Sequence, residues 1–522
     1  MAVSPTEILA VTLKEYAVSP TLGLPAPGER TAVGSKACKQ GPGQLPSRRQ
    51  LLVALACVVP CLPMQSMLAA EPTNGSQRSK GLLIQPTGIP LLNTRAKIVM
   101  ELEGKLLLEE PDPSKSDGVR EAEVKGKSTL DYFEKIAFED SALTAAGRRY
   151  VEAKVENWIS GSASSQELRP ECRETRLLKH DGKWQQFSEN EALMAREVEL
   201  VQSPVNSAAL ELLLPTEAAK PNATWELSPS DAAQVFNLEA VHRSTVTAKI
   251  AKVEKGKATV ELSGELQATA NSVPTTLKIQ GNLHVELASQ TAFITWLGLV
   301  IKEERDISQT EPGFVITARI RLIRTETKDE LQITDAELRQ LAKTEDPGRW
   351  LIRLKSTAGR YTLLADRRWS IYIDGGEEAI LRMVEKNSII AQCNITRLTK
   401  LDEGTQLTLE GLQADIKQSL GKSFESFLES SEKVTSSKLR LMRCVAMGVS
   451  EDVPIQWVYC HLSDDHGQRL ALIYTMGGNV TDRFAAADEQ MTSSFEMLAA
   501  PAPTDVPTPA PQVSSKPTQA PR

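Results

Sequence analysis

The stretch "LKIQGNLHVELA", residues 277–288, decides the fold of the larger part of the chain. Apolar and polar side chains alternate in it with period two, whereas an amphipathic helix repeats its apolar positions every three or four residues. Successive side chains of a strand point to opposite faces, so this alternation predicts a half-buried antiparallel strand. The predicted inner face carries Leu277, Ile279, Gly281, Leu283, Val285 and Leu287, and the outer face Lys278, Gln280, Asn282, His284 and Glu286.

The same alternation extends over residues 93–345, for example in "FVITARIRLIR", which places Ile316 and Ile320 inward. Hairpins are predicted where "STVTAKIAKV" leads through residues 254–257 into "ATVELSGEL", and where "TRLLKHDGKWQQF" turns on Asp181-Gly182. We therefore expect a large antiparallel sheet with few helices and one face in water.

Capping boxes predict two helix starts, one at Ser188 with Glu191 and one at Thr334 with Glu337. After the second of these, "TEDPG" breaks the pattern, and we place a domain boundary near residue 346.

Residues 346–498 predict a second domain with the element order βββ-α-βββ-α, so the fold class of the chain is α+β. Its first helix is expected where apolar residues recur every three or four positions, and "DRFAAADEQMTSSFEML" predicts the last one. Both faces of the hairpin "RLMRCVAMGVSEDVPIQWVYCHL" are apolar, which is typical of a sheet covered on both sides. The first helix is expected to bury Leu409, Leu412, Ile416, Leu420, Phe424 and Leu428.

This order, with "PIQWVYCHLSDDHGQRLALIYTM" leading into a final amphipathic helix, resembles the PsbP/DcrB-like α/β/α sandwich. The resemblance covers about residues 350–498 and implies a non-enzymatic envelope or lumenal protein. The β-rich domain, residues 93–345, resembles the curved sheets of periplasmic lipoprotein carriers such as LolA.

An export signal is predicted at residues 47–70. "SRRQLLVALACVVPC" combines Arg48 and Arg49 with an apolar run, and "MLAAEP" supplies small residues before Glu71. The run is shorter than the ~20 residues that a membrane span needs. We expect cleavage after Ala70 and a periplasmic or secreted protein without a transmembrane segment. Sec and twin-arginine export both stay open.

The remaining segments are expected to lie outside the folded domains. Residues 1–46 are either a disordered extension or a mis-annotated start, and residues 71–92 form a linker. Residues 499–522 contain seven prolines and predict an extended tail.

Four cysteines follow the signal, and two of them could be either joined by a disulfide or reduced. If the hairpin closes symmetrically around Asp452, Cys444 and Cys460 face each other across the strands, where a disulfide could join them. Two reduced cysteines in a core are the alternative, and no CxxC motif suggests zinc or redox chemistry.

One cluster is a candidate for binding a protein partner, namely Arg367, Arg368 and Trp369, because arginine and tryptophan are enriched at binding hot spots. The alternative is that strand alternation buries Trp369 and exposes Arg368. No nucleophile-elbow or HExxH motif is present, and the five histidines do not have metal-ligand spacing, so we expect no catalytic, cofactor or metal site.

The net charge of −7 becomes −10 without the first 70 residues, and no basic stripe suggests nucleic acid. Three hypotheses of function follow. The first is an exported, non-enzymatic envelope protein that binds a protein partner or assists assembly. The second is a carrier whose curved sheet holds a lipid or other apolar ligand, which requires a cavity on the inner face. The third is a hydrolase with an unrecognised site.

Overall fold

A computed structural model describes residues 93–109, 118–139, 142–288, 291–308, 311–329, 331–402 and 404–499. The predicted signal, the segments on either side of it and nearly all of the proline-rich tail lie outside these residues. Among the described residues, no helix is long and apolar enough to cross a bilayer.

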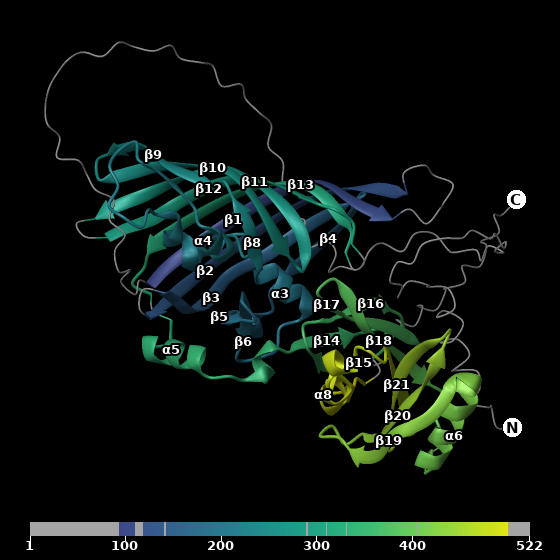
Figure 1. Cartoon of the computed structure of the whole chain (residues 1–522). Helices are drawn as coiled ribbons and strands as arrows, with labels where there is room; N and C mark the ends of the chain where they lie inside the picture. The colour runs from purple at the N-terminus through teal and green to yellow at the C-terminus, as the bar shows by residue number, and fades with distance from the viewer. Residues whose placement is uncertain are drawn as a thin grey trace, which may run out of the picture.

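Thirteen antiparallel strands form one curved sheet in the β-rich domain (Figure 1). The sheet runs from the edge strand β6 through β5, β3, β2, β1, β13, β12, β11, β10 and β9 to the edge strand β7, with β4 paired to β3 and β8 to β10. The strands are β1 (Asn93–Glu109), β2 (Val119–Glu139), β3 (Ala142–Ile159), β4 (Ser162–Glu167), β5 (Glu174–His180), β6 (Lys183–Ser188), β7 (Thr224–Glu226), β8 (Ala240–Ser244), β9 (Thr247–Glu254), β10 (Lys257–Ala270), β11 (Val273–Ala288), β12 (Thr291–Arg305) and β13 (Gly313–Glu326).

Two predicted hairpins are confirmed. Asp181-Gly182 joins β5 to β6 with φ of 48° and 79°, and Lys255-Gly256 joins β9 to β10 with φ of 47° and 77°. Two consecutive residues with positive φ match the right-handed twist of the flanking strands, which explains why glycine occupies the second position of each turn.

Residues 189–239, which we call the insert, lie against the inner face of the sheet except for β7, which forms one edge of it. The insert contains α3 (Ala195–Val201), the 3-10 helix η2 (Ser207–Leu213), β7 and α4 (Pro229–Val235). Leu210 and Leu213 of η2 and Phe236 after α4 are buried against the sheet residues in one hydrophobic core. The predicted capping box at Ser188 and Glu191 does not form. The short helix that follows begins at Ala195, and Glu191 forms an ion pair with Arg353 instead.

The predicted capping box at Thr334 and Glu337 is confirmed at the start of α5 (Asp335–Lys343). The 3-10 helix η3 (Pro347–Trp350) then leads to the second domain, residues 346–498, which we call the C-terminal domain.

The C-terminal domain contains a three-stranded sheet, β14-β15-β23, and a seven-stranded sheet in the order β16-β17-β18-β22-β21-β20-β19. Helix α6 covers one face of the larger sheet, and α7 and α8 pack against the other. The elements are β14 (Ile352–Ser356), β15 (Tyr361–Ala365), β16 (Trp369–Asp374), β17 (Glu378–Glu385), β18 (Ser388–Leu398), α6 (Leu409–Leu420), β19 (Phe424–Val434), β20 (Arg440–Ser450), β21 (Val453–Ser463), β22 (Arg469–Gly477), α7 (Thr481–Phe484), α8 (Ala487–Ser493) and β23 (Glu496–Met497).

The first helix of this domain is shorter than predicted. Helix α6 ends at Gly421, which has a φ of 53°, and residues 424–434 form the edge strand β19. Four strands rather than three therefore lie between α6 and α7, and five strands, β14 to β18, rather than three precede α6. The predicted last helix is also divided, because Ala485 adopts a φ of 51° between α7 and α8.

Cys444 and Cys460 do not face each other, so of the two alternatives the disulfide is excluded. The β20–β21 hairpin closes through the two-residue turn Glu451-Asp452, so Cys444 pairs with Tyr459 and Cys460 with Arg443. This shift of one position places the two thiols on opposite faces of the sheet, Cys444 under α6 and Cys460 on the side of α8. Both cysteines are buried and free.

Candidate functional site

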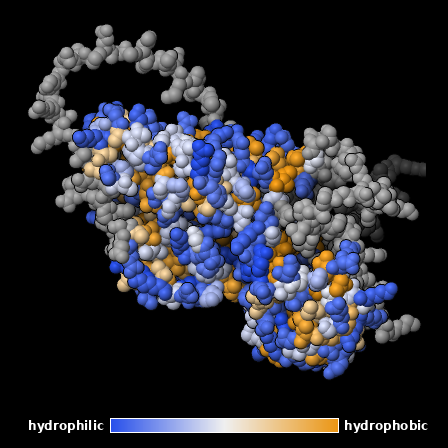
Figure 2. Space-filling model, in the orientation of Figure 1, coloured by the Kyte–Doolittle hydropathy of each residue, from blue (hydrophilic) through white to orange (hydrophobic). Residues whose placement is uncertain are grey.

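A cavity of about 2600 Å³ is bounded by the inner face of the curved sheet, the insert and one corner of the C-terminal domain. Its volume exceeds the ~300–1,000 Å³ of a typical small-molecule site. In the view of Figure 2, hydrophobic side chains are exposed among hydrophilic ones on both domains.

Apolar side chains from four neighbouring strands form the floor of this cavity. In one row across the sheet, Ala318 of β13 pairs with Leu102 of β1 and with Ile301 of β12. Met100 lies one row away on one side, and the next row on the other contains Ile316 and Leu277. Glu303 lies between Ile316 and Leu277 in that row. Leu102, Leu277, Ile301 and Ile316 are at most 4% exposed, whereas Met100 and Ala318 are only partly buried. We call these six apolar residues the floor: Met100, Leu102, Leu277, Ile301, Ile316 and Ala318.

The floor ends at a buried polar cluster. The Arg305 side chain is 1% exposed and forms ion pairs with Glu303 at 2.7 Å and Glu311 at 3.3 Å. Thr275 donates a hydrogen bond to Glu303 at 2.8 Å. Because two carboxylates neutralise one guanidinium here, this end of the cavity has no excess of positive charge.

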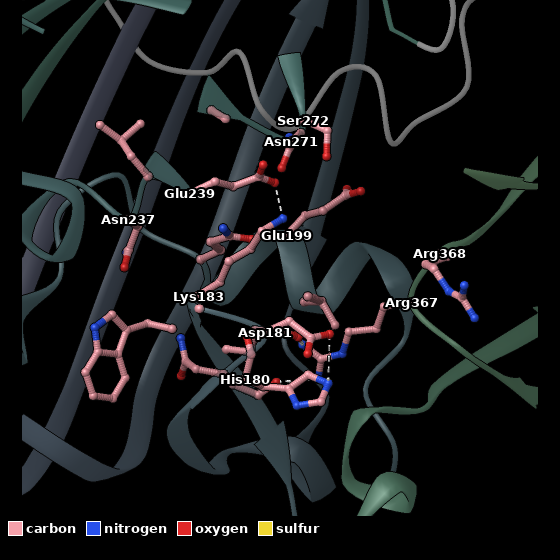
Figure 3. A pocket seen from close by; sticks show the side chains of 18 of the residues that line it. His180, Asp181, Lys183, Glu199, Asn237, Glu239, Asn271, Ser272, Arg367 and Arg368 are labelled. Carbon is pink, nitrogen blue, oxygen red and sulfur yellow. Dashed lines mark hydrogen bonds and ion pairs between the residues drawn. The ribbon is translucent and has the colours of Figure 1, made fainter. Parts of the chain in front are cut away.

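At the rim of the cavity, a contact joins strands from opposite ends of the open sheet. Lys183 on the edge strand β6 forms an ion pair with Glu239, which directly precedes β8 (Figure 3). Asn237 is anchored beside them, where its side-chain amide donates to the Ser203 carbonyl at 2.6 Å. These contacts fix the insert at the entrance of the cavity.

Buried charges hold the remainder of the insert against the sheet. Arg148 donates to Glu134 at 2.8 Å, and the Ser207 hydroxyl donates to the same carboxylate oxygen at 2.7 Å. Arg324 donates to the Ser207 carbonyl at 2.8 Å and forms an ion pair with Glu211. Burial lowers the pKa of Arg324 to about 10, and the ion pair keeps its charge compensated in the core.

The floor is the first wall of the cavity, and strands β16, β17 and β18 supply the second wall. Tyr372, Arg382, Val384 and Ile389 line the cavity from this corner of the C-terminal domain. Tyr372 is 46% exposed and Ile389 36%, so this wall presents apolar surface to the opening.

The structure separates the three residues predicted as a partner-binding cluster. Trp369 is fully buried in the C-terminal core, as strand alternation suggests. Arg367 reaches the β-rich domain, where it donates to the carbonyl of Gln186 at 2.6 Å. Arg368 pairs with Asp366 and Glu385 within its own domain. In Figure 3 the Arg367 side chain points toward the β-rich domain, whereas the Arg368 side chain points away from it, and the contacts of Arg367 brace the junction of the two domains.

Sequence reasoning missed both walls of the cavity. The alternation identified Ile316 and Leu277 as inward-facing, but it carried no signal of which inward positions the insert covers. Within the described ranges, no three His, Cys, Asp or Glu side chains are grouped so that they could hold a metal ion.

No family model matches the chain, and no curated protein matches it in sequence. A solved structure from Bacteroides thetaiotaomicron VPI-5482 is similar over 28% of this chain and 48% of that one, with 10% identity and a TM-score of 0.21. This chain thus spans about half the length of that protein.

Cyanobacterial PsbP from Synechocystis sp. PCC 6803 is similar over 28% of this chain and 92% of its own, with 11% identity and a TM-score of 0.23. A lipovitellin structure described by its lipid-protein interactions is similar over 48% of this chain and 27% of its own, with 12% identity and a TM-score of 0.27. These TM-scores are too low to carry an argument, and the resemblance to LolA stays a prediction.

Proposed function

We propose that this chain is an exported, non-enzymatic binding protein of the cell envelope whose curved sheet holds an apolar or amphipathic ligand. The cavity with its apolar floor carries this proposal, since the carrier hypothesis requires a cavity on the inner face. A ligand placed there would cover Met100 and Ala318, which are only partly buried.

The size of the cavity favours a long ligand such as a lipid. A typical drug-sized ligand fills ~300–1,000 Å³, so about 2600 Å³ leaves room for an extended acyl chain. Export and the PsbP/DcrB-like fold of residues 350–498 are also parts of the proposal. The first is tested by the N-terminal sequence of the natural protein, and the second by superposing an experimental structure on PsbP.

Binding of the neutral fluorescent probe N-phenyl-1-naphthylamine to the full chain tests the cavity. We expect saturable fluorescence enhancement that dodecanoate displaces. The substitution Ala318→Trp should weaken probe binding at least about tenfold, because an indole then fills the middle of the floor where Ala318 meets Leu102 and Ile301.

The matched control is Val315→Trp, three residues earlier on the same strand. Val315 is 37% exposed on the outer face, so its replacement adds the same side chain without entering the cavity. Equal loss of binding in both variants, or no probe binding to the wild-type chain, would overturn the proposal.

A further inference from the structure

Arg382 on the second wall is held in place by neutral groups. Its Cζ atom lies 3.7 Å from the ring centroid of Tyr372, and its Nε donates to the Gln392 side chain at 3.4 Å. Ser370 and Gln392 are its cross-strand partners on β16 and β18. A cation stacked on an aromatic ring with a hydrogen bond at Nε has a restricted orientation before any ligand binds.

Arg382 differs in its charge environment from other arginines that line the cavity. Arg148 is paired with Glu134, Arg305 with Glu303 and Glu311, and Arg368 with Asp366 and Glu385. Within the described ranges, no carboxylate lies at ion-pair distance from Arg382, and neither of its Nη atoms has a hydrogen-bond partner. The terminal nitrogens of the guanidinium therefore remain available to a ligand.

The free side of a guanidinium fits carboxylates and phosphates, which accept two parallel N–H bonds from it. Arg382 and the apolar floor line the same continuous cavity. A molecule with an acyl chain and an anionic end could pack its chain on the floor and pair its anion with Arg382 at the same time.

We propose that Arg382, stacked on Tyr372, binds the carboxylate or phosphate head group of an amphipathic ligand whose apolar part lies on the floor. This inference rests on the proposed function and adds the charge of the ligand. The polar cluster at Arg305 is already balanced by two carboxylates, so it does not compete for the anion.

Displacement of N-phenyl-1-naphthylamine by three ligands of equal chain length tests the inference on the full chain. Dodecanoate carries a carboxylate, dodecyl phosphate a phosphate, and dodecanol no charge. Arg382→Gln should weaken the binding of the two anions about tenfold or more, because it removes a charge-assisted contact. It should change the affinity for dodecanol and for the probe by less than about twofold. Arg382→Lys should restore part of the loss.

Arg321→Gln is the matched control, since it makes the same change at an exposed arginine of β13 that does not line the cavity. It should leave all three ligands nearly unchanged. A loss restricted to one anion would support the inference and identify that head group.

Two results would overturn the inference. If Arg382→Gln weakens the binding of dodecanol as much as that of the anions, or weakens the binding of no ligand, Arg382 does not bind the head group. The proposed function survives in either case. If the wild-type chain does not bind the probe at all, the proposed function fails as well.

Discussion

At the scale of single residues, His461 makes the stability of the C-terminal domain depend on pH. The side chain is buried on β21, and neither ring nitrogen has a hydrogen-bond partner on another residue. Burial and the neighbouring Arg469 and Arg440 lower its pKa from 6.5 to about 4. The folded state therefore favours the neutral ring.

We expect a corresponding loss of stability in acid. The contribution of His461 is complete above pH 6.5 and is lost as the pH falls toward its folded pKa of about 4, by no more than about 3 kcal/mol. Thermal unfolding followed by circular dichroism should show a smaller acid-induced fall of Tm in His461→Leu than in wild type. The same substitution at the exposed His466 should leave the dependence of Tm on pH as it is in wild type. The same dependence of Tm on pH in all three proteins would contradict the prediction.

Arg324 should be costly to remove because it compensates Glu211 in the core. Arg324→Met leaves that carboxylate and the Ser207 carbonyl without their partner, which should cost about 3–5 kcal/mol. The double variant Arg324→Met, Glu211→Met should recover part of the Tm lost by the single variant. A double variant that is less stable than the single one would show that the pair does not stabilise the insert in this way.

At the scale of elements, periodicity predicted the helix α6 but not where it ends, nor that the strand β19 follows it. The apolar spacing from Leu409 to Leu428 fits one long helix, but the chain stops the helix at Gly421 and uses the next residues as an edge strand. Leu420 is consequently 5% exposed, whereas Leu428 is 56% exposed. A single long helix would bury both.

Alanine substitutions at these two leucines distinguish the alternatives. Leu420→Ala should lower the free energy of unfolding by about 2–5 kcal/mol because it leaves a cavity under α6. Leu428→Ala should change it by less than about 0.5 kcal/mol. Thermal unfolding of both variants provides the measurement, and a comparable loss at Leu428 would favour the long helix.

The hairpin of β20 and β21 predicts free thiols even in an oxidising compartment. Cys444 and Cys460 lie on opposite faces of the sheet, and burial raises the pKa of both thiols, so neither should react with iodoacetamide in the native chain. After unfolding without reductant, peptide mass spectrometry should find both cysteines alkylated. A peptide cross-linked between them would contradict the observed register.

At the scale of the whole molecule, the sequence predicted the layers better than the site. Alternation identified strands such as β11 and β13, and Gly182 and Gly256 marked the turns of the β5–β6 and β9–β10 hairpins, because these features depend on neighbours along the chain. The cavity depends on contacts between distant segments. Its entrance requires Lys183 to meet Glu239, and its second wall requires Arg367 to join Gln186, and neither pair has a local signal.

The central claim is that the inner face of the curved sheet binds a long apolar chain. Native mass spectrometry of the full chain mixed with dodecanoate tests it most directly, with Ala318→Trp and Val315→Trp measured in parallel. We expect ligand-bound wild type and Val315→Trp, and a mainly bare Ala318→Trp chain. A wild-type chain that stays bare, or an Ala318→Trp chain that binds as much dodecanoate as wild type, would contradict the account.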